Sequence, residues 1–406
     1  MTLRVIVAAA VAIAIVALPV AEGQESVVED FVIEPIVIGG QFDGEIEFDQ
    51  PIVSDLIPGD APIDAVVADG VVEGTHRAHG GCGHSSGCDC AGSREYLVFD
   101  VLFLDRDNAT NNQPILVDGT AGLNPGGTVF TTRSMVPTTA PGVRLFFGRH
   151  GGDTAGWEMG YWGVYGWYGD ARVTTNRSLA IPGDIGHAVP GWDSASTVRA
   201  TWSSSLNVVE LNLLASEFTS GHEPCSRWPQ RRCRHETEVD WIGGLFWAGL
   251  DEQAALQVAP FAGESPTSYR VATSSNLFGG QLGARGRRTW DRFSLESSLK
   301  AGLGGAWLSQ STSPIRSSLA PNFDYRPGRS AVDTGLGFLS SMNLSMAYRF
   351  SDVWGLRLGY NVAWLSGVAL APNQWDFTDT QTSGTGVQGA GGLFLHGANV
   401  GLEARW

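Results

Sequence analysis

Charged residues are scarce in this chain of 406 residues, at 17% of the sequence, and long apolar runs are nearly absent. No window of 18 apolar residues occurs beyond the extreme N-terminus, which argues against membrane-spanning helices in the mature protein. The HExxH and P-loop patterns of common enzymes are also missing. We therefore expect no enzyme, and we expect no nucleic-acid partner.

Glycine and tryptophan are abundant instead, with 53 Gly and 14 Trp. The N-terminal segment 1–23 has one early positive charge at Arg4, an apolar run over 5–20, and small residues at Ala21 and Gly23. This pattern predicts a cleaved secretory signal, the alternative being a retained N-terminal anchor.

The negative charge is concentrated in one segment. Residues 24–75 hold thirteen Asp or Glu and no Lys or Arg, out of a formal net charge of −16. Gly, Pro and acidic residues interrupt the short apolar clusters too often for a core, so we expect 24–93 to be a disordered acidic linker. Solvation is the simplest role for its charge, and binding of cations is the alternative.

A tract rich in His and Cys lies at 76–90 within this linker. Imidazoles and thiolates in a flexible glycine-rich loop suit zinc or copper. The candidate ligands are His76, His79, Cys82, His84, Cys88 and Cys90. There are two alternatives for this tract: a low-complexity spacer with incidental thiols, or a disulfide between two of its cysteines. Cys225 and Cys233 form a second candidate disulfide elsewhere in the chain. We expect no other cofactor.

From residue 94 onward, apolar and polar residues alternate along long segments. In the last fourteen residues, Phe394, His396, Ala398, Val400, Leu402, Ala404 and Trp406 share one face of an extended strand, and charged or small residues share the other. One face suits lipid and the other suits water. A C-terminal strand of this kind, ending on an aromatic residue, is typical of a transmembrane β-barrel.

Ten such segments are predicted, near 94–106, 142–150, 155–169, 205–217, 238–252, 268–285, 289–307, 333–350, 353–372 and 393–406. The long connections between them are 107–141, 170–204, 253–267, 308–332 and 373–392. The short connections are 151–154, 286–288 and 351–352. The fold class is therefore all-β: a single transmembrane antiparallel barrel of about 10–12 strands over 94–406. Twelve strands would explain the long connection at 218–237.

Several segments occur in an order and spacing that resembles a known family. They are GWEMGYW at 156–162, NVVELNLL at 207–214 and NLFGGQLG at 276–283, with others at 241–252, 300–302, 356–364 and 368–372. It is the planctomycete outer-membrane β-barrel family, long catalogued as a domain of unknown function. The resemblance covers 94–406. It implies an outer-membrane location and supplies no catalytic residues.

Three functions remain open. The first is a structural or narrow-channel barrel with long extracellular loops and both termini in the periplasm, whose lumen is narrow or blocked by paired charges. The predicted lumen-facing residues are Asp100, Glu158, Glu210, Glu296, Lys300, Arg357, Asn361 and Glu403, with Asn343, Arg349 and Arg405. The second, a surface binding or adhesion protein, would use the barrel as a mount. The third, a membrane-embedded enzyme, would use Asp184, His187, Asp193 and Ser194.

The expected partners are outer-membrane lipid and the barrel-assembly machinery, which would meet the C-terminal strand. A basic run at Arg227, Arg231, Arg232 and Arg234 is interpreted as a solvated turn. The alternative is contact with the acidic segment or with an anionic cell-wall polymer.

Overall fold

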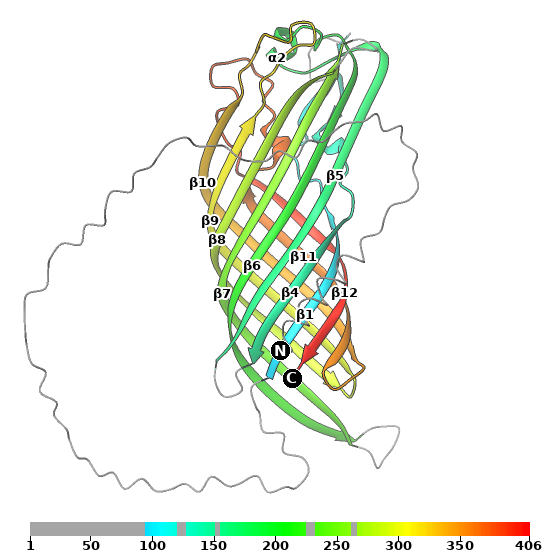
Figure 1. Ribbon diagram of the computed structural model, residues 1–406, viewed down its shortest axis with the longest axis vertical. Coiled ribbons are helices and arrows are strands. Elements are labelled where there is room, and N and C mark those ends of the chain that lie inside the picture. The colour runs from blue at the N-terminus through cyan, green and yellow to red at the C-terminus, as the bar shows by residue number, and fades with distance from the viewer. Residues whose placement is uncertain (1–93, 120–126, 151–154, 225–231, 261–265) are drawn as a thin grey trace, which may run out of the picture. The chain divides into compact units, whose positions relative to one another are not determined.

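The computed structural model describes residues 94–119, 127–150, 155–224, 232–260 and 266–406. Most of them belong to one antiparallel sheet (Figure 1). Its strands are β1 (Arg94–Arg106), β2 (Pro114–Asp118), β3 (Thr128–Thr131), β4 (Ala140–His150), β5 (Gly156–Ala180), β6 (Ala195–Pro224), β7 (Arg232–Ala259), β8 (Thr267–Trp290), β9 (Phe293–Thr312), β10 (Arg329–Arg349), β11 (Trp354–Val368) and β12 (Gly391–Arg405). The short helices are α2 (Asp184–Ala188), η3 (Thr132–Ser134) and η4 (Ala371–Gln374).

Ten of these strands close into a barrel. Each pairs with its neighbour in the order β5-β4-β1-β12-β11-β10-β9-β8-β7-β6, and β6 pairs with β5 to complete the circle. The first and last strands meet directly, with Tyr96 opposite Arg405 and Leu104 opposite Gly397. The predicted all-β antiparallel barrel is thus confirmed, with ten strands. β2 and β3 form a side hairpin attached to the far end of β5.

The two ends of the barrel differ. At one end, here called the terminal end, β1 begins and β12 finishes, and the backbones of Glu95 and Trp406 are hydrogen-bonded. At the other end, here called the loop end, four connections meet: the described parts of 107–139, and 181–194, 313–328 and 369–390. Among the described residues, no helix is long and apolar enough to span a membrane.

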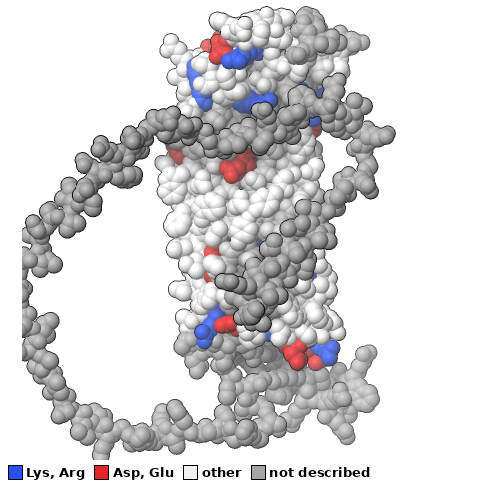
Figure 2. Space-filling view, in the orientation of Figure 1, with Lys and Arg blue, Asp and Glu red and all other residues white. Residues whose placement is uncertain are grey.

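Alternation along each strand separates an apolar outside from a mixed inside. On β8, Phe278 and Leu282 point outward and are exposed, whereas Leu277 and Gln281 point inward and are buried. On β12, Phe394 and Val400 are exposed while Leu395 and Asn399 are buried. Figure 2 shows few charged side chains across the middle of the face in view, and more toward its two ends. An apolar belt of this kind around a closed barrel suits lipid.

The long connections were predicted wrongly on one side of the barrel. β5, β6 and β7 continue far beyond the apolar belt, so that much of 170–204 and 218–237 is strand rather than loop. Arg172 pairs with Arg199 and Thr219 with Thr237 in these extensions. The alternation that identified the strands is lost here because the outer face no longer contacts lipid and carries polar residues. The predicted turn at 286–288 is also wrong, since β8 runs to Trp290 and β9 begins at Phe293.

Candidate functional site

The barrel interior is the candidate site, because most of the buried charge lies there. The eight side chains of the principal lumen-facing set, Asp100, Glu158, Glu210, Glu296, Lys300, Arg357, Asn361 and Glu403, are all buried. Asn343 is buried as well, and Arg405 is partly buried. Arg349 departs from the prediction: it is exposed at the terminal end, where its guanidinium donates to the Asp291 carbonyl at 2.7 Å.

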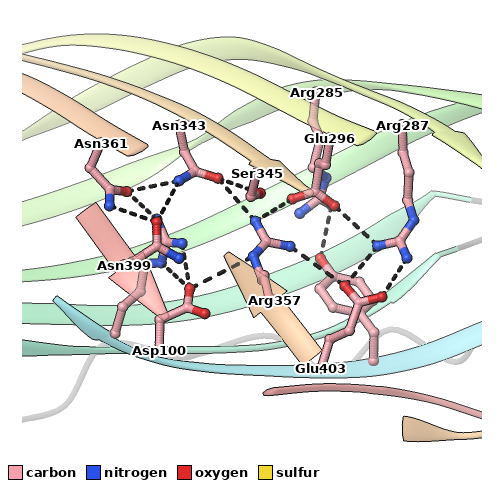
Figure 3. A network of polar contacts seen from close by, with 12 residues as sticks. Asp100, Arg285, Arg287, Glu296, Asn343, Ser345, Arg357, Asn361, Asn399 and Glu403 are labelled. Carbon is pink, nitrogen blue, oxygen red and sulfur yellow. Dashed lines mark hydrogen bonds and ion pairs between the residues drawn. The ribbon is translucent and has the colours of Figure 1, made fainter. Parts of the chain in front are cut away.

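Arg357 lies at the centre of one group of contacts (Figure 3). Its Nη2 lies 2.8 Å from Glu296 Oε1 and donates to Asn343 Oδ1 at 2.9 Å. On one side, Glu403 accepts from Arg287, whose Nη1 lies 2.9 Å from Glu403 Oε2. These contacts join β8, β9, β10, β11 and β12 across the lumen.

Asp100 and Arg144 extend this group toward β1 and β4. Arg144 Nε donates to Asp100 Oδ2 at 2.9 Å, and its Nη1 donates to Asn361 Oδ1 at 2.6 Å. Asn361 in turn donates to Asn399 Oδ1 at 2.9 Å. A buried guanidinium is tolerable only when carboxylates and amides satisfy its donors in this way.

Glu158 and Glu210 belong to a second group. Glu158 Oε2 accepts from Tyr96 at 2.6 Å and from Arg285 Nη1 at 2.5 Å. Glu210 forms an ion pair with Lys300, and its Oε2 accepts from Gln281 at 2.9 Å. Both carboxylates are therefore neutralised by a cation and held by neutral donors.

Several interior residues were missed by the sequence analysis. They are Arg144, Asn212, Glu238, Asp240, Gln281, Arg285 and Arg287, all at inward positions of their strands. The two-residue period of a strand could have identified them in the sequence, since Glu238, Asp240 and Ile242 share one face of β7. The surrounding Gly243, Gly244 and Gly249 obscured it, because glycine marks neither face.

Charge in this polar half of the barrel is nearly balanced. Seven carboxylates, Asp100, Glu158, Glu210, Glu238, Asp240, Glu296 and Glu403, face six cations, Arg144, Arg285, Arg287, Lys300, Arg357 and Arg405. His150 lies beside Glu238 and Asp240. The interior is thus an ion-pair network rather than a ring of one sign.

An apolar layer lies between this network and the loop end. It includes Trp162 and Trp167 of β5, Phe246 of β7 and Leu308 of β9, packed against residues 368–371 and Trp375 of the β11–β12 connection. η4 therefore enters the barrel mouth as a plug. A cavity of about 80 Å³ remains between the polar and apolar layers, lined by Trp162 and Lys300 among others.

A separate buried ion pair, outside the network, fixes the plug. Arg106 Nη1 lies 2.5 Å from Glu252 Oε1 and donates to Ser204 Oγ at 2.6 Å. Its guanidinium lies 4.5 Å from the ring centre of Trp202. The other oxygen of Glu252 accepts from the backbone N–H of Ala371 at 2.8 Å. One carboxylate thus connects the barrel wall with η4.

The connections at the loop end form a folded structure, here called the cap. Arg326 is buried, lies 4.8 Å from the ring centre of Tyr269, and donates to the carbonyls of Asp376 at 2.8 Å and Thr378 at 3.2 Å. The N–H of Ile185 donates to Phe377 O at 3.1 Å. Gln113 donates to the Trp375 carbonyl at 2.8 Å. All four connections therefore meet on residues 373–378.

An open groove of about 650 Å³ lies on the surface of the cap. Its lining comprises Pro266, Thr267, Ser268, Arg270, Ser313, Pro314, Arg316, Ser317, Ser318 and Pro321. Two arginines and five hydroxyl residues contribute to it, and none of the lining residues that the structure describes is acidic. Arg316 is anchored by Asp324, with Nε 2.5 Å from Oδ1.

The residues proposed for an enzyme do not form a constellation. Asp184 and His187 lie in α2, and Ser194 donates to Asp193 at 3.2 Å. Within the part of the chain that the structure describes, no hydrogen bond joins His187 to Asp184, Asp193 or Ser194.

Some predicted sites fall outside the described residues. They are the His/Cys tract at 76–90, the acidic segment, and Cys225, Arg227 and Arg231. Arg232, Cys233 and Arg234 belong to β7, but their side chains are outside the described set.

A closed antiparallel wall, an apolar belt and a filled polar interior together define a transmembrane β-barrel. The chain matches no protein-family model and no curated protein. Among solved structures, it is similar to a FadL homologue of Pseudomonas aeruginosa, at 12% identity over 77% of this chain and 90% of that one, with a TM-score of 0.22. It is also similar to OmpT of Vibrio cholerae, at 10% identity over 78% and 97% of the two chains, with a TM-score of 0.17. A third is the P. putida toluene transporter TodX, at 11% identity over 79% and 90%, with a TM-score of 0.16. At these TM-scores the matches carry no argument about the role of this chain.

Proposed function

We propose that this protein is an outer-membrane β-barrel with a structural, non-conducting role, and that its cap faces the outside of the cell. The observation that carries the proposal is the filled lumen. Balanced ion pairs occupy the polar half, and the apolar layer with η4 occupies the other half. Ten strands also lie near the small end of the size range, where side chains alone fill a barrel.

Conduction through this interior would have to break buried ion pairs. A permeating ion would need to displace contacts such as Arg357 with Glu296 and Lys300 with Glu210. Removing one partner of a buried pair typically costs about 3–5 kcal/mol, since the other charge is left uncompensated. An apolar layer beyond the network adds a second barrier, because it offers no ligands to an ion.

The outer membrane is favoured by the strand count and by the sides on which the connections lie. Single-chain barrels of bacterial outer membranes have an even number of strands, short periplasmic turns and longer outer loops. Here the turns at 291–292 and 350–353 are short and the cap connections are long. The terminal end would then face the periplasm, together with the linker at 24–93.

Planar-bilayer recording tests the non-conducting role. Purified barrel, recognised by its mobility shift on boiling, is expected to give no discrete current steps. A variant in which residues 370–390 are replaced by a short Gly-Ser turn lacks η4 and serves as the opened control. Steps from the unaltered protein would favour the narrow-channel alternative. Silence from the unaltered protein with steps from the opened variant would support the proposal.

A binding role for the cap is the second candidate, and the groove favours it. Its two arginines and five hydroxyl residues suit an anionic, hydroxyl-rich ligand such as an acidic polysaccharide. The R270A/R316A double variant should lose binding to such a polymer. R172A, which removes an exposed arginine from β5 outside the groove lining, should retain binding. Equal binding by all three proteins would count against this role.

A further inference from the structure

Three metal-ligand side chains meet inside the barrel near the terminal end. His150 is the last residue of β4, and Glu238 and Asp240 are successive inward residues of β7. His150 Nδ1 lies 2.8 Å from Glu238 Oε1 and 3.3 Å from Asp240 Oδ1. All three residues are buried, and their ligand atoms lie within 4.8 Å of one another. β4 and β7 are not neighbours, because β5 and β6 stand between them.

The arrangement fits a metal ion in its distances. Ligand atoms bound to zinc at about 2.0–2.2 Å in a tetrahedron lie roughly 3.3–3.6 Å apart. The separations of Nδ1 from the two oxygens, 2.8 and 3.3 Å, need only small side-chain adjustments to reach that range. Moreover, a nitrogen such as Nδ1 carries at most one proton, yet two carboxylate oxygens face it. A cation between the three atoms would satisfy both oxygens at once.

The surrounding groups orient the carboxylates. Asp240 Oδ2 accepts from Arg285 Nε at 2.9 Å, and Glu238 Oε2 lies 3.4 Å from Arg405 Nη1. Each acid thus turns one oxygen toward an arginine and the other toward His150. The ring of Tyr96 lies 4.7 Å from the imidazole, tilted by 31°, and limits its rotation. Such outer contacts commonly fix the orientation of metal ligands.

Charge and access set limits on the affinity. The polar interior has seven carboxylates against six Arg and Lys, so it can accept added positive charge. Arg285 and Arg405 nevertheless repel a cation, and we expect weaker binding than at a thiolate site. Glu238, though neither His150 nor Asp240, also lines a cavity of about 60 Å³ at the terminal end, so one of the three ligands borders a space that can admit an ion.

We propose that His150, Glu238 and Asp240 form a binding site for Zn²⁺ that connects β4 with β7 across the lumen. One imidazole and two carboxylates leave a fourth position for water, and imidazole ligands favour zinc over magnesium or calcium. The ion would act as a structural staple, since it joins two strands that share no backbone hydrogen bonds. It would stabilise the folded barrel in proportion to the zinc concentration.

The test measures the unfolding temperature of the full-length barrel in detergent, with Zn²⁺ and with a chelator. Zinc should raise the midpoint by a few degrees for the unaltered protein. H150A and D240N should abolish the zinc-dependent rise. H187A, which removes an exposed histidine from α2, is the matched control and should keep it. No rise for the unaltered protein, or an undiminished rise for H150A, would overturn the proposal.

The His/Cys tract at 76–90 requires its own control, because it is a candidate ligand set for the same ion. A variant that lacks all six candidate ligands of the tract, H76A/H79A/C82S/H84A/C88S/C90S, should keep the zinc-dependent rise if the barrel site is responsible. Co²⁺ gives an independent readout: ligands of one nitrogen and two oxygens produce weak visible bands without thiolate charge transfer. In this six-residue variant, loss of these bands on H150A substitution is expected. Bands that persist in H150A would contradict the site.

Discussion

Among the described carboxylates of the interior, Glu252 is the one that contacts both an arginine of the barrel wall and the backbone of η4. It pairs with Arg106 of β1, and it accepts a hydrogen bond from the backbone of Ala371 in η4. Removing its charge therefore affects both the barrel wall and the plug. Arg106 would remain buried among Trp167, Trp202 and Ser204 with no counter-charge.

We expect E252A to destabilise the barrel by about 3–5 kcal/mol, the usual effect of leaving a buried charge unpaired. Urea unfolding followed by tryptophan fluorescence measures the change. The double variant R106M/E252L is the control, since replacement of both charges by apolar side chains is often close to neutral. If the single and double variants were equally destabilised, loss of packing rather than the unpaired charge would be the cause.

Asp376 predicts how the cap responds to acid. Partial burial alone would raise the pKa of this carboxyl. The carboxylate accepts hydrogen bonds from the Thr378 hydroxyl and from the N–H groups of Thr378 and Gly384, and Arg326 lies nearby. Together these groups hold the pKa below its ordinary value. A lowered folded pKa means that the stabilisation is present above the unfolded pKa of about 3.9 and is lost as pH falls through the folded value.

Amide hydrogen exchange over 376–385 should therefore accelerate as the pH is lowered below about 4, once the intrinsic pH dependence of exchange is removed. The barrel strands should stay protected in the same range. D376N should show the faster exchange at neutral pH and little further change with acid. A wild-type cap that keeps its protection throughout this range would show that Asp376 does not control the loop.

Among the strands, β11 has a defined interruption where it separates from β10. Gly367 has a φ of +79°, and a Cβ there would lie 2.2 Å from the carbonyl oxygen of Leu336. The register with β12 shifts between Ser366 and Val368 at the same point. This bulge turns the chain from the wall into the lumen, so that η4 follows within three residues.

G367A is expected to destabilise the barrel by about 1–2 kcal/mol from the left-handed conformation alone, with a further cost from the contact with Leu336. The temperature at which the heat-modified band appears on electrophoresis measures the loss. G335A, on the adjoining part of β10, is the matched control because a Cβ there meets nothing within 4 Å. Equal behaviour of the two variants would remove the bulge as a determinant of stability.

For the barrel as a whole, the apolar belt predicts where charge is tolerated. Leu282 and Ser274 both face outward on β8, but Leu282 is 74% exposed within the belt and Ser274 lies eight residues toward the loop end. At roughly 3.3 Å per residue and a strand tilt near 40°, that is roughly 20 Å along the barrel axis. The two positions should therefore face lipid and water, respectively.

L282R should destabilise the barrel in lipid vesicles by about 2–4 kcal/mol, as expected for arginine near the middle of a bilayer. S274R should change the stability little. Reversible unfolding in vesicles by urea compares the two. The comparison is made in lipid vesicles because the belt contacts lipid only in a membrane. If L282R were as stable in vesicles as the unaltered protein, the transmembrane assignment of this belt would be contradicted.

Much of the wall followed from the sequence, because lipid outside and a packed interior inside impose a two-residue period on every strand. The ten strands, their antiparallel order and the inward set from Asp100 to Glu403 all rest on that period. It disappeared where the environment changed. In the extensions of β5, β6 and β7, no lipid contacts the outer face, so Arg172 and Arg199 sit where apolar residues would have marked a strand.

The sequence by itself determined which face of each strand is apolar, and hence the class of fold. The tertiary structure decided the partners inside. Arg357 meets Glu296 from 61 residues away, and Arg144 meets Asn361 from 217 residues away, because strands far apart in sequence face each other across a narrow lumen. It also decided that η4 closes the barrel, since a bulge at Gly367 turns one loop inward. Alternation records only inside and outside, whereas the contacts depend on the height and direction of each side chain around the closed wall.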